Sequence, residues 1–291
     1  MKKFRDQLRT SDFVVTASLP LTPETTARDV RDAAALLKAH VDALQVGDNH
    51  DVDGHMSPLA VAALARDAGL DSVMHLSCRD RNRIALQAEI LGAAALGVTS
   101  LVLMRGDKLP GATALARGVF QVDARQLIEL ATAIGNNAKL VSPPGFSIGS
   151  RVLAFRPDKD WHATRVAEKV DAGSNFLQTQ PCLNPDICHE YIARLVEMKL
   201  THRVSIIVEV PVLTRAKALK SMKEHVPGAA IPDTVVKRLA RAENTAKEGV
   251  AIAAEAIAAM RKVPGVAGVN VVCDTGVQHI VEAIRKSRAI H

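Results

Sequence analysis

Two short apolar segments of this 291-residue chain end in side chains that can bind or activate a ligand. Residues 72–77 carry His75 and lead into Cys78, and residues 100–104 lead directly into Arg105-Gly106-Asp107. A histidine can exchange a proton, an arginine can hold an anion, and a carboxylate can accept hydrogen bonds from a ring. Because apolar strands belong in a protein interior, charged groups at their ends need a functional or structural reason.

Each of these residues also has a structural interpretation. Arg105 and Asp107 are spaced to form a surface ion pair, and an isolated histidine such as His75 is commonly a hydrogen-bonded core residue. Gln178 and Gln180 share one face of another apolar segment, because side chains alternate along a strand. Two neutral amides there favour hydrogen bonding to a heterocycle, and glutamines in a packing layer are the alternative.

Apolar, β-branched segments alternate with segments of helical period along the chain. We expect strands at residues 13–19, 43–47, 72–77, 100–104, 147–154, 176–180, 205–212 and 269–273. We expect helices at residues 25–39, 57–68, 80–96, 122–134, 161–172, 185–198, 215–225, 232–242, 246–261 and 277–287. This rhythm predicts an α/β fold, a single (βα)8 TIM barrel over residues 1–291. A doubly wound open sheet is the alternative, but the glycine-rich dinucleotide fingerprint is missing after the first strand.

The carboxyl ends of the strands meet at one mouth of such a barrel, and active sites are built there. Collecting these ends gives a ring that includes Ser18, Asp48, His75, Arg105, Asp107, Phe155, Gln178, Gln180 and Glu209. Cys78, Cys182 and Cys273 also fall at or just after strand ends. Buried free thiols are expected for them, a thiolate metal site is the alternative, and no metal is expected.

Composition narrows the class of ligand and the cellular location that we expect. The formal net charge is +6, but only 3% of residues are aromatic, so stacking platforms for nucleic acid are scarce. A phosphorylated or polycarboxylate small molecule fits this balance better than DNA or RNA. No apolar run is long enough to span a bilayer, and the basic first residues lack the apolar core of a signal peptide. We therefore expect a cytoplasmic protein without a nucleic-acid or membrane partner.

The segment His75-Leu-Ser-Cys-Arg-Asp-Arg-Asn82 resembles methylenetetrahydrofolate reductases, most closely the forms fused to or partnered with methyltransferases. Further motifs that carry this resemblance are Leu91-Gly-Ala-Ala-Ala-Leu-Gly-Val98, Arg105-Gly-Asp107, Pro110-Gly-Ala-Thr113, the segment 169–181, Glu209-Val-Pro-Val212 and matching residues between 226 and 255. The motifs follow the family order over nearly the whole chain. The resemblance rests on their combination.

The resemblance implies a flavin-containing (βα)8 barrel that passes a hydride from NAD(P)H through FAD to 5,10-methylenetetrahydrofolate, which yields 5-methyltetrahydrofolate. It places Asp107 near the flavin and the pterin, and Gln180 against the pterin and the nicotinamide. Residues that would hold or border FAD are His75, Arg105, Gly106, Asp107, Phe120 and Lys169. Gln178 and Glu209, like Gln180, are candidates for binding the substrate.

One departure from the family pattern concerns proton delivery. Ser18 stands where the family carries a glutamate, the proposed proton donor to the substrate nitrogen. A serine hydroxyl is a poor general acid near neutral pH, so delivery of the proton would need water, Asp107 or Glu209.

The sequence therefore predicts an atypical reductase that binds a tetrahydrofolate-type molecule. The alternatives are a non-redox pterin-binding or methyl-transfer protein and a non-catalytic subunit that docks a methyltransferase. Each of these functions is compatible with a homo-oligomer. Each is also compatible with a partner subunit, either a methyltransferase or an electron-transfer protein.

Overall fold

Eight parallel strands close into a barrel in the computed structural model, which describes residues 2–49, 54–108, 116–137, 140, 144–226 and 228–290. The strands are β1 Val14–Ser18, β2 Ala43–Val46, β3 Ser72–Ser77, β4 Ser100–Met104, β5 Ser147–Val152, β6 Phe176–Pro181, β7 Ser205–Pro211 and β8 Val266–Val272. Each strand pairs with its neighbours in sequence, and β1 pairs with β8 to complete the circle. The predicted (βα)8 TIM barrel is confirmed, and an open sheet is excluded.

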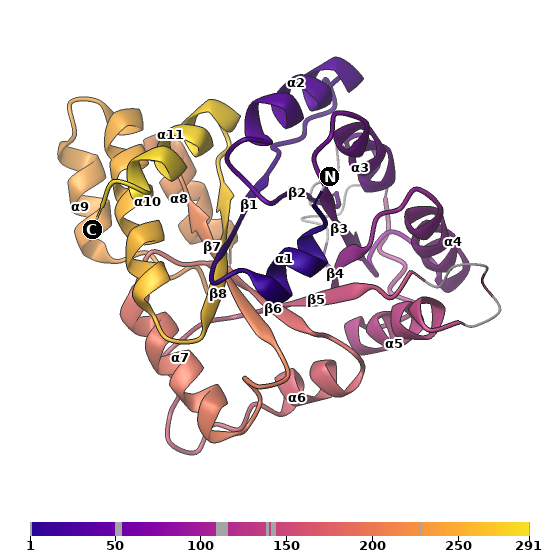
Figure 1. Ribbon diagram of the computed structural model, residues 1–291. Helices are drawn as coiled ribbons and strands as arrows, with labels where there is room; N and C mark the ends of the chain where they lie inside the picture. The colour runs from indigo at the N-terminus through magenta and orange to yellow at the C-terminus, as the bar shows by residue number, and fades with distance from the viewer. Residues whose placement is uncertain are drawn as a thin grey trace.

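Helices surround the barrel on all sides (Figure 1). They are α1 Phe4–Thr10, α2 Ala27–Leu37, α3 Pro58–Asp67, α4 Arg83–Ala95, α5 Ala124–Gly135, α6 Thr164–Asp171, α7 Pro185–Glu197, α8 Ala216–His225, α9 Asp233–Arg241, α10 Thr245–Lys262 and α11 Val277–Ser287. The three consecutive helices predicted between the last two strands are confirmed as α8, α9 and α10. Within the described ranges, no helix is long and apolar enough to cross a membrane.

Side-chain caps explain where several helices begin. The helix expected from residue 80 starts at Arg83, because the Asn82 side chain accepts a hydrogen bond from the Ala85 N–H at 2.9 Å. Ser57 caps α3 in the same way, ahead of a proline at the first helical position. Such caps satisfy backbone N–H groups that have no partner inside the helix.

The end of β5 differs from the expectation. The strand ends at Val152 instead of residue 154, so Phe155 does not lie at a strand end. Its ring packs against Trp161 and Tyr191, with centroid distances of 5.2 and 5.7 Å. Aromatic rings gain from such edge-on and tilted contacts, which favours this cluster over a position in the barrel mouth. Phe155 is therefore removed from the predicted ring of site residues.

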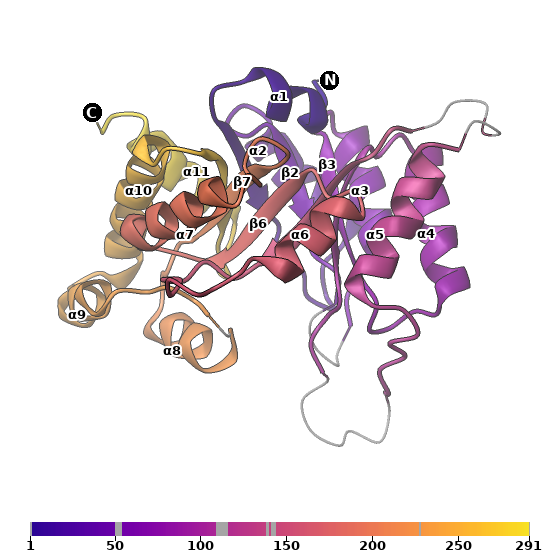
Figure 2. The ribbon, with the colours of Figure 1, turned by 90° about the horizontal axis from the view of Figure 1, so that it is seen from below.

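The short helix α1 was not expected, and it closes the amino-terminal end of the barrel. Phe4 is fully buried and meets the Phe176 ring edge-on at 5.6 Å. Its backbone N–H donates to the Asp71 carboxylate at 2.8 Å, and Arg66 pairs with the same carboxylate. We call the apolar layer here the floor; it consists of Phe4, Val14, Ala43, Val73, Val102, Phe176 and Ile207. In Figure 2, α1 lies at the opposite end of the barrel from α8.

Room for the floor depends on a glycine in β5. A Cβ atom at Gly149 would lie 2.3 Å from the Phe176 ring, a distance that no side chain tolerates. The next inward position on several strands is polar instead of apolar. We call this second layer the polar layer; its members are Thr16, Gln45, His75, Arg151, Gln178, Glu209 and Asn270. The barrel thus changes from apolar to polar toward the carboxyl ends of its strands.

Candidate active site

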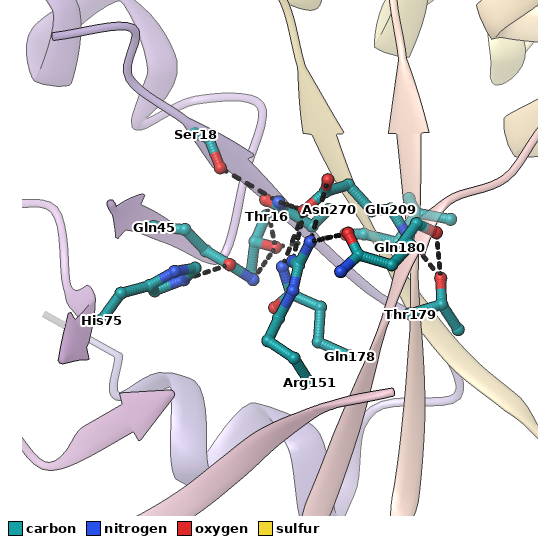
Figure 3. Close-up of polar contacts among 11 residues, drawn as sticks. Thr16, Ser18, Gln45, His75, Arg151, Gln178, Thr179, Gln180, Glu209 and Asn270 are labelled. Carbon is teal, nitrogen blue, oxygen red and sulfur yellow. Dashed lines mark hydrogen bonds and ion pairs between the residues drawn. The ribbon is translucent and has the colours of Figure 1, made fainter. Parts of the chain in front are cut away.

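Hydrogen bonds join the polar layer from β3 across β2 and β1 to β8 (Figure 3). The His75 Nε2 atom lies 2.8 Å from Gln45 Oε1, and Gln45 Nε2 donates to Thr16 Oγ1 at 3.0 Å. Thr16 donates to Asn270 Oδ1 at 3.1 Å, and Asn270 Nδ2 donates to Ser18 Oγ at 3.0 Å. Buried polar groups are stable only when partners satisfy them, so this chain of bonds fixes each side chain in place.

Glu209 forms the charged centre of the layer. Arg151 Nη1 donates to Glu209 Oε2 at 2.6 Å, and Arg151 Nη2 donates to Oε1 at 3.3 Å. Gln178 Nε2 donates to Oε2 at 3.1 Å, and Arg151 Nη2 donates to Gln180 Oε1 at 2.8 Å. Burial alone would raise the pKa of Glu209, but the Arg151 charge and these hydrogen bonds hold it below its ordinary value. The side chain is therefore a carboxylate at neutral pH.

His75 is a neutral member of the layer. Burial, reinforced by the nearby Arg151 charge, lowers the pKa of His75 to about 3, although the Glu209 charge acts in the opposite direction. The imidazole is thus uncharged at neutral pH. It can serve a ligand as a hydrogen-bonding group, but it does not supply a positive charge for a phosphate.

Two buried polar atoms near the mouth have no partner among the described residues: Gln178 Oε1 and Ser77 Oγ. Gln178 is completely buried, and its amide nitrogen is already committed to Glu209. An unpaired buried acceptor costs about 1–3 kcal/mol, so native proteins rarely keep one without a reason. A bound ligand with a suitable N–H group would satisfy Gln178. Gln178 Oε1 is therefore a buried acceptor that a bound molecule could use.

The predicted Arg105-Gly106-Asp107 motif lies on the rim, at the end of β4. Arg105 and Asp107 are exposed, and the Arg105 guanidinium stacks over the Phe120 ring at 4.7 Å. Arg105 and Asp107 do not pair with each other within the described residues, so the surface ion pair considered from the sequence is not formed. Gly106 has a φ of 80°, and a Cβ there would lie 3.0 Å from the Arg79 side chain. The positive φ and the close contact both favour glycine at this turn.

Lys169 is placed differently from the other predicted residues. Its Nζ atom, on α6, donates to the backbone carbonyl of Arg151 at 2.7 Å. Burial lowers its pKa, and the neighbouring Arg165 charge adds to this effect. Lys169 therefore supports the strand that carries Arg151.

The predicted site residues fall into three groups in the structure. Those that lie together in the barrel are Ser18, His75, Gln178, Gln180 and Glu209. Those that lie on the rim are Arg105, Gly106, Asp107 and Phe120. Lys169 lies behind Arg151, the residue that binds Glu209.

Four polar-layer residues were missed by the analysis of strand ends: Thr16, Gln45, Arg151 and Asn270. Thr16 lies two positions before Ser18, as Gln178 lies two positions before Gln180. Because inward-facing side chains recur at every second residue, the alternation rule could have found them. Arg151, a charged residue inside an apolar strand, carried the clearest signal.

The cysteines are buried free thiols, as expected. Burial raises the pKa of Cys78 to about 12, which makes it unreactive at neutral pH. Cys182 Sγ and Cys188 Sγ lie 3.4 Å apart. Within the part of the chain that the structure describes, no three metal-ligating side chains gather in one place. The polar groups of the mouth include a carboxylate, a guanidinium and amides, which suit the binding of a polar heterocycle.

Known proteins match this chain in sequence and in fold. The family model described as methylenetetrahydrofolate reductase matches residues 8–273. A probable methylenetetrahydrofolate reductase (NADPH) from Caenorhabditis elegans is 25% identical over 159 residues, which are 54% of this chain and 23% of the worm protein. The chain therefore matches less than a quarter of that longer relative.

A solved structure from Clostridium thermocellum, an uncharacterized protein that binds two copies of 5-methyl-5,6,7,8-tetrahydrofolic acid, shares the fold. Its TM-score is 0.67 at 12% identity, with 98% of each chain covered. Identity at this level shows a common fold alone. The family assignment rests on the sequence match, which extends over almost the entire barrel and includes every residue of the polar layer. The chain belongs to the methylenetetrahydrofolate reductase family.

Proposed function

We propose that the protein is a methylenetetrahydrofolate reductase-like oxidoreductase, which reduces 5,10-methylenetetrahydrofolate to 5-methyltetrahydrofolate with NADH or NADPH. The observation that carries the proposal is the ionised Glu209, held by Arg151 and Gln178 beside an unpaired buried acceptor. Family membership and the binding of 5-methyltetrahydrofolic acid by a protein of the same fold support a folate-type ligand. The net charge of +6 suits the carboxylates of a folate tail.

The polar layer would bind the pterin ring. Gln178 and Gln180 offer amide groups toward the mouth. Glu209 offers its Oε1 atom, which within the described residues accepts one hydrogen bond, from Arg151 Nη2 at 3.3 Å. Opening of the methylene bridge creates a cationic iminium on the substrate, and an ionised carboxylate close to the ring stabilises such a charge. Glu209 is therefore proposed to bind substrate and to stabilise the developing cation.

Protonation of the substrate nitrogen needs another group. Glu209 is ionised, and Ser18 has a hydroxyl that is a poor acid, so neither is suited to deliver a proton near neutral pH. Asp107 is the predicted carboxyl group on the rim, where it is open to solvent. We assign proton delivery to water or to Asp107, with Ser18 acting as a hydrogen-bonding contact.

FAD is part of the proposal, and some of the residues predicted to bind it are placed to do so. Arg105 and Phe120 on the rim offer an exposed cation and an aromatic face. Lys169 and His75 are already hydrogen-bonded within the protein, and His75 is uncharged. The rim residues would therefore hold FAD. When bound, FAD would carry the hydride between the nicotinamide and the pterin.

The reaction is tested by anaerobic oxidation of NADH and NADPH, with and without methylenetetrahydrofolate and with and without added FAD. We expect oxidation that depends on the pterin, with 5-methyltetrahydrofolate as the product by chromatography. A requirement for added FAD would support the flavin part, and turnover without it in flavin-free protein would reject that part alone. Absence of pterin-dependent turnover with either donor in the presence of FAD would reject the reductase.

Asp107→Asn is expected to lower kcat at least tenfold, because the variant keeps the shape of the side chain but removes its proton-exchanging group. The melting temperature should stay within about 2 °C of the parent value, since the side chain is exposed. Kinetics in the same assay measure the effect. Asp32→Asn, in an exposed pair on α2, is the control and should leave kcat unchanged. Equal kcat for Asp107→Asn and the parent protein would remove Asp107 from the mechanism.

A second candidate function is non-redox binding or transfer of a methyl- or methylene-pterin. The observation that favours it is the lack of a good proton donor among the described residues of the polar layer and Ser18, since Glu209 is ionised and Ser18 has only a hydroxyl group. Tight binding of 5-methyltetrahydrofolate in calorimetry, combined with no turnover in the assay above, would support this function over the reductase.

A further inference from the structure

Arg151 and Glu209 determine which way two neighbouring amides face. A guanidinium has only hydrogen-bond donors, so Gln180 must turn its carbonyl oxygen toward Arg151, at 2.8 Å from Nη2. The amide NH2 group of Gln180 then points away from the arginine. A carboxylate has only acceptors, so Gln178 must turn its NH2 group toward Glu209, at 3.1 Å. The carbonyl oxygen of Gln178 is left without a partner.

The two glutamines therefore present opposite groups to a ligand. Gln178 is completely buried and offers an acceptor, whereas Gln180, two residues nearer the mouth, is half-buried and offers a donor. Gln180 Oε1 and Glu209 Oε1 contact the same Arg151 nitrogen, at 2.8 and 3.3 Å, so these groups lie around one point of the site. The ion pair is the common cause of both orientations, because each amide is held by one of its two members.

We propose that Arg151 is a specificity-determining residue, which through Gln178 and Gln180 makes the site select a ligand with a lactam edge, an N–H group next to a carbonyl. This inference rests on the proposed binding of a pterin, and it names the class as 4-oxopteridines. The lactam N–H would satisfy the Gln178 acceptor, and the ring carbonyl would accept from the Gln180 NH2 group. A 4-aminopteridine reverses this pattern, since its ring nitrogen accepts and its amino group donates.

Discrimination follows from the cost of mismatched buried groups. With a 4-amino ring, the ring nitrogen would face the Gln178 oxygen, which places two acceptors together. The ligand amino group would face the Gln180 NH2 group, which places two donors together. The unsatisfied groups correspond to a preference on the order of 30-fold in affinity for the 4-oxo ring. Without the guanidinium, Gln180 is free to rotate its terminal amide, because that torsion is broad and roughly two-fold. Removal of Arg151 is therefore expected to reduce the preference to about three-fold or less.

The test compares 5-methyltetrahydrofolate with its 4-amino-4-deoxy analogue by anaerobic calorimetry at pH 8.5, where both rings are neutral. The parent protein should prefer the 4-oxo ligand about 30-fold. Arg151→Met should abolish most of this preference. Arg151→Lys keeps a cation beside Glu209 but holds Gln180 less firmly, so an intermediate preference is expected. Arg156→Met removes an exposed arginine that pairs with Glu190, and this control should keep the parent ratio.

A ratio of two affinities separates this role from a merely structural one, since general damage weakens both ligands together. The double variant Arg151→Met/Glu209→Gln, which leaves no unpaired charge, provides a folded reference if Arg151→Met does not fold. Equal affinities in the parent protein, or an unchanged ratio in both Arg151→Met and the double variant, would overturn the inference while the proposed function stands. Failure of the parent protein to bind either pterin would reject both. A change in NADH affinity without a change in the pterin ratio would contradict the assignment to the pterin.

Discussion

Arg151→Met is expected to lower the free energy of unfolding by about 3 kcal/mol at neutral pH, because it leaves the Glu209 carboxylate buried without its partner. The exposed fractions of the two side chains are 19% for Arg151 and 10% for Glu209, so solvent does little to replace the lost contact. The double variant Arg151→Met/Glu209→Gln should lose less stability than Arg151→Met alone, since it contains no unpaired charge. Urea denaturation of the four proteins of this cycle measures the effect.

The control for this cycle is again Arg156→Met. Arg156 and Glu190 form an ion pair in which the side chains are 61% and 43% exposed, and such pairs contribute less than about 1 kcal/mol. A loss in Arg151→Met no larger than the loss in this control would show that the polar layer tolerates an unpaired Glu209. Additive losses in the double variant would show that Arg151 and Glu209 are not coupled.

Lowering the pH from 7.5 to 5 is expected to reduce the free energy of unfolding by roughly 2 kcal/mol through His75 alone. The folded pKa of His75 is about 3, and the ordinary value is 6.5. Between these values the unfolded chain binds a proton that the folded protein does not, so this stability is complete above pH 6.5 and decreases as the pH falls toward 3. Glu209 acts in a lower window, because its lowered pKa contributes stability that is lost below its ordinary value of 4.5.

His75→Gln should remove this dependence between pH 7.5 and 5, because glutamine does not titrate. His202→Gln, a substitution of an exposed histidine, should retain it and serves as the matched control. Urea denaturation at both pH values, with the difference taken for each variant, isolates the contribution of His75. An identical pH dependence in His75→Gln and the parent protein would mean that His75 is not held neutral in the folded state.

The barrel could be predicted from the sequence because its strands repeat a simple physical pattern. The bounds of β3, β4 and α11 are those that apolar runs and turn residues indicate. The helix α1 escaped prediction, since it is only seven residues long and has one fully buried anchor, Phe4. The end of β5 was also wrong, because an apolar run does not reveal where a strand stops pairing and an aromatic cluster begins.

The candidate site could be predicted only for residues at the tips of strands. His75, Gln178, Gln180 and Glu209 were named as candidates, whereas Arg151 was missed because its strand was expected to continue to residue 154, which placed Phe155 at the strand end. Sequence alone also could not show that the Lys169 amino group bonds to a backbone carbonyl. Such a choice of partner depends on distances between elements that are far apart in the chain. Sequence patterns therefore located the mouth of the barrel, and the structure revealed its electrostatic centre.

The floor beneath the polar layer has a consequence for the order of events. Phe4 and Phe176 close one end of the barrel, so among the described residues a ligand that bonds to Gln178 would have to approach from the other end, past Gln180 and the rim. Two reactants that bound there would share one entrance, and the one nearer Gln178 would bind first and leave last. A barrel closed at one end would in this way order binding and release without any moving part.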